Sequence, residues 1–192
     1  RAGVNLELMS DDFSYDVIPQ ERQDLQQRTF GKLPDSGKAF VFRGMAKFGR
    51  VNQDDYNYDG LLFTQSLAHS DTLWGADFRF TQLESELRWY KKLPWRSNLA
   101  LRLGLGLGST QQIQHLYYLG GLDHVRGFVD SRFRGSNYWS ANAEYRIAPF
   151  ASRWLVVQPT AFIDAATASD TPGELTHLDA ASAGLGLRII SP

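Results

Sequence analysis

One short stretch of this 192-residue sequence, Gly120–Ser136, carries side chains suited to ion pairing rather than to covalent chemistry. It lies between two segments of alternating hydrophobicity and has the glycine and charge content of a loop, yet in Val125-Arg126-Gly127-Phe128 two apolar residues flank an arginine and a glycine. A guanidinium can hold carboxylates in bidentate geometry, which lysine cannot match. Glu144 and Asp164, on later segments, are candidate partners, and the alternative is an exposed loop with an incidental arginine.

Residues that would support enzymatic chemistry are scattered. The four histidines, His69, His115, His124 and His177, lie near segment ends without the spacing of metal ligands. The absence of cysteine excludes a disulfide framework and a thiolate metal site. The sequence therefore predicts no catalytic residue, no metal and no cofactor, and an outer-membrane lipase or protease remains as the enzymatic alternative.

Composition excludes two classes of protein. The formal net charge is -1 and the pI is about 6.5, so the chain lacks the basic footprint of a nucleic-acid-binding protein. An uninterrupted apolar stretch long enough for a transmembrane helix is also absent. A low average hydropathy still agrees with a transmembrane β-barrel, because lipid-facing apolar residues alternate there with polar residues of the lumen.

Strict alternation of residue type runs through much of the chain. In Leu99–Gly108 every odd position is leucine and every even position is alanine, arginine or glycine, which predicts a strand with one apolar face. The same period recurs over Trp139–Ile147, Leu155–Ala165 and Ala181–Ile189, and less regularly over Gly3–Met9, Ala39–Phe48, Gly60–His69 and Thr81–Lys91. These make about eight strands of roughly 9 to 12 residues, the length that a tilted strand needs to cross a bilayer.

The connections between these segments alternate in length. Short ones are predicted at Asn52–Asp59, Lys91–Arg96 and Pro149–Arg153, and long ones at Ser10–Lys38, Thr110–Asn137 and Thr167–Asp179. Outer-membrane barrels have short periplasmic turns and long external loops, so both termini are expected on the periplasmic side. Trp95, Trp154, Tyr138 and Trp139 lie near strand ends and are expected to form the aromatic girdles at the two membrane interfaces.

Charges on the second face of the strands argue against a soluble antiparallel sandwich or a lipocalin-like barrel. That face carries Glu84, Glu86, Arg88, Arg102, Glu144, Arg146, Asp164 and Arg188. A small soluble barrel fills its interior with side chains and would bury apolar residues there. The observed pattern favours an antiparallel transmembrane barrel, in which the two glutamates at 84 and 86 balance the arginines at 88, 102 and 188 across the lumen. A loop folded into that lumen would bring Arg126 to Asp164, Glu144 or both, whereas an exposed loop would leave the arginine in water.

At these residues the chain resembles the BamA, TamA and FhaC superfamily of outer-membrane protein assembly and two-partner secretion barrels. The resemblance rests on Tyr118–Gly121, Val125-Arg126-Gly127-Phe128, Ala143–Arg146 and Phe162-Ile163-Asp164, in this order. It implies that the loop lies inside the barrel and that its motif residues, Val125, Arg126, Gly127 and Phe128, anchor it. The implied partners on the inner wall are Glu144, Phe162 and Asp164, the last two in an F-x-D-x-G motif in which Ala166 stands where glycine is usual.

The resemblance also implies a larger barrel than residues 1–192 supply. Family barrels have about twice as many strands and usually follow soluble periplasmic repeat domains, so this chain is expected to be a partial outer-membrane barrel domain without such repeats, ending at Ser191–Pro192 before two further strands. An eight-stranded interior is just wide enough for wall side chains. Five glycines, at 104, 106, 108, 184 and 186, nevertheless leave the inner wall bare. We therefore predict that the chain is no closed eight-stranded barrel around its loop, but part of a larger barrel or a wall completed by a second chain or copy.

Two functions agree with these patterns. The first is a non-enzymatic outer-membrane barrel that inserts other outer-membrane proteins or translocates a secreted polypeptide, with a weak seam between its first and last strands and an exposed edge that pairs with a client strand. Its partners would be the lipid bilayer and the client polypeptides. The alternative is a small structural or adhesion barrel without clients.

Overall fold

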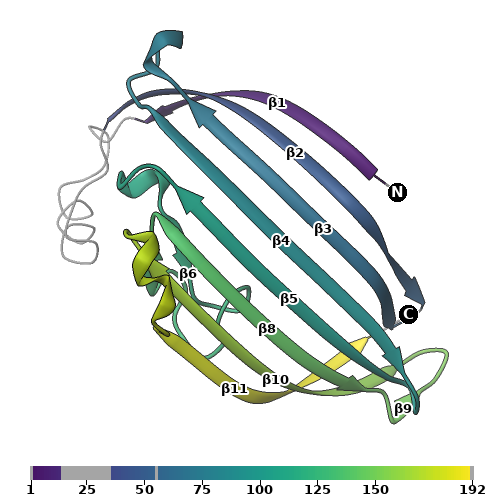
Figure 1. Cartoon of the computed structure of the whole chain (residues 1–192). Coiled ribbons are helices and arrows are strands. Elements are labelled where there is room, and N and C mark those ends of the chain that lie inside the picture. The colour runs from purple at the N-terminus through teal and green to yellow at the C-terminus, as the bar shows by residue number, and fades with distance from the viewer. Residues whose placement is uncertain (1, 14–35, 55, 191–192) are drawn as a thin grey trace.

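The computed structural model of the chain describes residues 2–13, 36–54 and 56–190. Eight long antiparallel strands form one strongly curved sheet, a half-barrel (Figure 1). They are β1 (Ala2–Phe13), β2 (Gly37–Asp54), β3 (Asn57–Ser70), β4 (Phe80–Leu93), β5 (Ser97–Gly108), β8 (Asn137–Ile147), β10 (Val156–Ser169) and β11 (Ala180–Ile190). Each pairs with the next along the chain, so the all-β antiparallel fold expected from the alternation is confirmed.

The remaining elements are short. The strand β9 (Phe150–Ala151) pairs with β10, and β6 (Tyr117–Leu119) pairs with β7 (Phe133–Gly135) in a separate two-stranded sheet. Single 3-10 turns follow β3, β5 and β10: η1 (Thr72–Trp74), η2 (Ile113–His115) and η3 (Pro172–Thr176). Among the described residues, no helix has the length and apolar character needed to cross a membrane.

The two faces of the strands differ as the sequence predicts. On β5 the side chains of Leu103 and Leu105 are exposed on the convex side, and on β10 Ile163 is exposed while Gln158 and Asp164 are completely buried. Because neighbouring residues of a strand point to opposite faces, this contrast separates an outer apolar surface from an inner polar one. The outer surface has the character of a lipid-facing wall.

Long and short connections lie at opposite ends of the sheet (Figure 1). At one end, residues 71–79, 109–136 and 170–179 connect the strands, and at the other end the connections are residues 55–56, 94–96 and 148–155. The chain enters β1 and leaves β11 at the short-turn end (Figure 1). Most of the long connection expected at Ser10–Lys38 lies outside the described residues, as do Ser191 and Pro192, while β1 extends to Phe13 and β2 begins at Gly37.

The short connection expected at Asn52–Asp59 is wrong in its bounds. The ladder between β2 and β3 continues to the pair Asp54 and Asn57, so most of this polar segment is strand. Two glycines allow the long pairing: Gly49 and Gly60 have φ angles of 101° and 131°, and a Cβ on either would come within 2.2 Å of a carbonyl oxygen of the opposite strand. Their polar composition made these strand ends resemble a loop.

The aromatic residues near the strand ends do not all face the membrane interface. The side chains of Trp95 and Trp154, on the short turns, are 87% and 74% exposed, as expected for an interfacial girdle. Trp95 and the following Arg96 both have positive φ angles, 58° and 55°. The expectation for Tyr138 is wrong, because it points inward, is buried, and donates its hydroxyl proton to Glu84 Oε1 at 2.7 Å. Neighbouring residues of a strand point to opposite faces, so Tyr138 must face inward if Trp139 faces outward.

The sheet is open. The strands β1 and β11 are the two ends of the strand order, and no register pairs them within the described ranges. Unpaired strand edges leave backbone N–H and C=O groups without partners, which costs several kcal/mol per group in lipid. The eight described strands therefore do not close on themselves, in agreement with the prediction from the sequence.

Candidate functional site: the seat of an inward-folded loop

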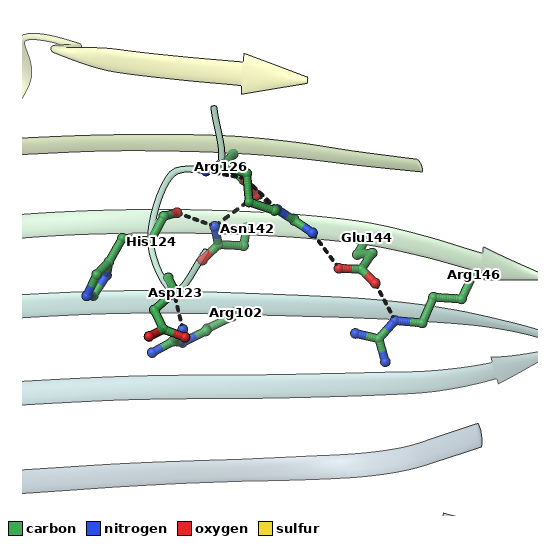
Figure 2. Close-up of polar contacts among 8 residues, drawn as sticks. Arg102, Asp123, His124, Arg126, Asn142, Glu144 and Arg146 are labelled. Carbon is green, nitrogen blue, oxygen red and sulfur yellow. Dashed lines mark hydrogen bonds and ion pairs between the residues drawn. The ribbon is translucent and has the colours of Figure 1, made fainter. Parts of the chain in front are cut away.

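The connection between β5 and β8 folds over the inner surface of the sheet, and Arg126 is its main polar contact (Figure 2). Its Nε and Nη2 donate to the two oxygens of Asp164 at 2.8 and 2.7 Å, which is bidentate geometry. Its Nη1 donates to Glu144 Oε2 at 2.7 Å, and its backbone N–H donates to Asp164 Oδ2 at 3.1 Å. The structure thus brings the loop arginine to both acids named from the sequence.

Strand register explains why the two acids lie together. Glu144 on β8 is the cross-strand partner of Phe162 on β10, and Asp164 is two residues further along the same face of β10. Asp164 is completely buried, and the Arg126 side chain is 20% exposed. A buried carboxylate requires a partner, so removing the arginine would leave an uncompensated charge. The hydrogen bond with Asp164 raises the pKa of Arg126 further above its ordinary value.

Phe162 supports the guanidinium from a third direction. The Arg126 Cζ lies 3.7 Å from the centroid of the Phe162 ring, a cation–π contact. The ring has room because residue 184, opposite it on β11, is glycine: a Cβ there would come within 2.6 Å of Phe162 Cζ. The lack of a side chain at Gly184 thus leaves space on the inner wall, and the Phe162 ring occupies that space.

The other motif residues fold the loop rather than contact the acids. The side chain of Val125 is completely buried in a cluster with Leu119 and Tyr138, and Phe128 packs against that cluster. Gly127 has a φ angle of 90°, a conformation that favours glycine, and the carbonyl of Phe128 accepts a hydrogen bond from the backbone of Gly121 at 3.1 Å. The apolar residues around the arginine therefore pack the loop against the wall, because the same cluster includes Tyr138 of β8, Ala166 of β10 and Ala180 of β11.

Several polar contacts of the site were not predicted. Asn142 on β8 donates through Nδ2 to the carbonyl oxygen of His124 at 2.6 Å and to Asp164 Oδ1 at 2.9 Å (Figure 2). Arg146 Nε donates to the second oxygen of Glu144 at 2.6 Å. The alternation over Trp139–Ile147 places both residues on the same inner face as Glu144, but it does not predict their partners.

The predicted charge balance among the inward residues holds in part. Glu86 pairs with two arginines, Arg88 and Arg102, through N···O distances of 2.6 Å each. The prediction fails for Glu84, which accepts the Tyr138 hydroxyl, and for Arg188, which makes no ion pair with the described residues. The described ranges also contain no group of three or more histidine or acidic residues arranged to hold a metal ion. The interactions that the site does show are the ion pairs of Arg126 with Glu144 and Asp164 and of Arg102 with Glu86.

Comparison with known proteins concerns the fold and the family of the chain. A search of curated protein sequences finds no significant match. Among solved structures, the crystal structure of BamA from Haemophilus ducreyi lacking POTRA domains 1-3 superposes with a TM-score of 0.68 at 16% sequence identity, over 98% of this chain. The match covers 44% of that chain, so the present chain spans less than half the length of this structure. The family model of the Omp85 superfamily domain matches residues 12–192, and the chain therefore belongs to the Omp85 superfamily.

Proposed function

We propose that the chain is part of the wall of an outer-membrane barrel that inserts outer-membrane proteins or translocates polypeptides, without covalent chemistry. The observation that carries this proposal is the set of four hydrogen bonds through which Arg126 ties the inward-folded loop to Asp164 and Glu144. A loop held in this way braces a curved, open wall against deformation. Membership of the Omp85 superfamily supports the same function.

The open sheet suggests how the wall is completed. The outward edges of β1 and β11 carry backbone groups that need partners in lipid. We infer that residues 1–192 form a partial barrel domain and that further strands, from the same polypeptide or from a second chain, continue the wall. The short-turn end, with both chain ends, would face the periplasm, as in other outer-membrane barrels.

Clients would be recognised by strand pairing. A polypeptide that alternates apolar and polar residues adds to a sheet edge through main-chain hydrogen bonds, and the lipid-facing side chains continue the apolar surface of the wall. This mechanism needs an edge that opens, and it needs a wall that keeps its curvature while the edge is open. The loop that Arg126 holds against the wall would keep this curvature.

The proposal can be tested with the intact protein in phospholipid vesicles and an unfolded outer-membrane barrel as client. Inserted client is measured by its heat-dependent shift in gel mobility, and translocated client by its protection from added protease. We expect more inserted or protected client than in empty vesicles, a loss of this gain in Arg126→Ala, and no loss in Arg132→Ala, which removes an exposed arginine of the same connection. A protein that performs no better than empty vesicles would refute the proposal in favour of a structural or adhesion barrel.

A further inference from the structure

The loop is also held by an arginine of the wall. Arg102 on β5 donates through Nη1 to the carbonyl oxygen of Asp123 at 2.6 Å (Figure 2). Arg126 reaches from the loop to the strands β8 and β10, whereas Arg102 reaches from strand β5 to the loop backbone. The two arginines therefore attach the same loop from opposite directions and at different points.

Glu86 orients Arg102 for this contact. The Nε of Arg102 donates to Glu86 Oε2 at 2.6 Å, and Glu86 Oε1 lies 2.6 Å from the Nε of Arg88. The side chain of Glu86 is 19% exposed, so its position is well defined by the surrounding wall. The Glu86 carboxylate holds the Nε side of the planar Arg102 guanidinium, so Nη1 points to the loop. The flexible ammonium of a lysine cannot make both contacts in this geometry.

Asn142 lies between the two attachments. Its Nδ2 donates both to the carbonyl oxygen of His124, next to Asp123, and to Asp164 Oδ1, the oxygen that also accepts from Arg126 Nη2. One amide group therefore contacts the backbone beside one attachment and the carboxylate of the other.

We propose that Arg102 is a positioning residue that seats the first limb of the loop, residues 121–124, through a contact outside the Val125–Phe128 motif, and that Asn142 couples the two attachments. The inference rests on the proposed role of the loop as a brace. It assigns to β4 and β5 a part of the loop seat that the motif does not include. When the Arg126 contacts break, the Arg102 contact still holds the first limb on the wall, while the second limb, which follows Arg126 and includes Val129, is released.

Spin labels on the two limbs test this directly. Leu122 and Val129 both have exposed side chains, one on each limb, and labels there can be followed by electron paramagnetic resonance in the intact protein in vesicles without a client. In Arg102→Gln we expect loss of the immobilised component at position 122 and its retention at 129. In Arg126→Ala we expect the reverse.

Control variants separate positioning from simple charge balance. Arg88→Gln removes the other arginine of the Glu86 pair, and Arg88 has no hydrogen bond or ion pair to the loop among the described residues, so label 122 should stay immobilised. Arg102→Lys keeps the charge but not the fork, and it should mobilise label 122 as Arg102→Gln does. If Arg102→Gln does not fold, Glu86→Gln, which loosens Arg102 without removing it, should still mobilise label 122.

Three outcomes would overturn the proposal: equal mobility at 122 in the Arg88 and Arg102 variants, release of both limbs by Arg102→Gln alone, or full restoration by lysine. Coupling through Asn142 predicts that Asn142→Ala mobilises both labels weakly, and unchanged labels would remove that part. Because these spectra are recorded without a client, they are independent of the insertion assay. A protein that inserts no client but shows the expected mobilities would refute the function and keep the positioning role.

Discussion

The substitution Gly184→Ala tests the packing of Phe162 without altering any charged residue. A Cβ at position 184 would lie 2.6 Å from Phe162 Cζ and 2.9 Å from Cε1, closer than carbon atoms approach without displacement. The ring must shift, and a shift changes its 3.7 Å contact with the Arg126 guanidinium. Overpacking costs about 1–3 kcal/mol and loss of a cation–π contact about 0.5–2 kcal/mol, so we expect a loss of about 2–4 kcal/mol in unfolding free energy.

A double-mutant cycle in urea, with the protein in detergent micelles, measures this effect. Phe162→Leu removes the ring, so Gly184→Ala in that background should cost less than about 1 kcal/mol, and the two changes should couple by roughly 1–3 kcal/mol. Gly3→Ala is the matched control, because a Cβ at position 3 would have no atom within 4 Å. Additive costs at 162 and 184, or a cost at 184 no larger than at position 3, would refute the reasoning.

The remaining predictions concern the ion pairs and the faces of the sheet. Arg126→Ala leaves the completely buried Asp164 without its cation and should lower the unfolding free energy by about 3–5 kcal/mol. Arg126→Ala combined with Asp164→Asn should recover part of that loss, and an equal or larger loss in the double variant would contradict this. Nitroxide labels at Leu187 and Arg188 on β11 should report lipid and water respectively through oxygen and chromium-chelate accessibility, and equal accessibility at both positions would reject the assignment of faces.

The strands and their faces were predictable because alternation with period two is a local property of the sequence. The leucines of β5 and the alternating residues of β8 and β10 each identify an outer face, and the same counting places Glu144 and Asp164 on the inner one. A guanidinium in the intervening loop then has two candidate partners. Parity also places Glu84 and Glu86 on this face, so the choice of Glu144 and Asp164 as partners depended in addition on the resemblance of the Val125–Phe128 motif.

The rest of the loop seat depends on backbone groups that carry no sequence signal. Arg102 and Asn142 bind the carbonyl oxygens of Asp123 and His124, and any residue type would present the same carbonyl. The strand ends near Asn52–Asp59 were missed for a related reason: the ladder continues through polar residues once the strand extends past the apolar band. Contacts made by the main chain become visible only when the path of the loop is known.

The turn between β4 and β5 has a consequence for the kinetics of folding. Trp95 and Arg96 both hold left-handed backbone angles without being glycine, and such residues cost on the order of 1–3 kcal/mol each. Hairpins that form from their turns use asparagine–glycine at these positions, so this turn opposes nucleation. The strands β4 and β5 pair from Gln82 with Gly108 to Leu93 with Ser97. Their pairing must then begin in the leucine-rich body of the strands and extend toward the turn, which closes last. Replacing Trp95-Arg96 by Asn-Gly should therefore speed the folding of this hairpin and leave its final register unchanged.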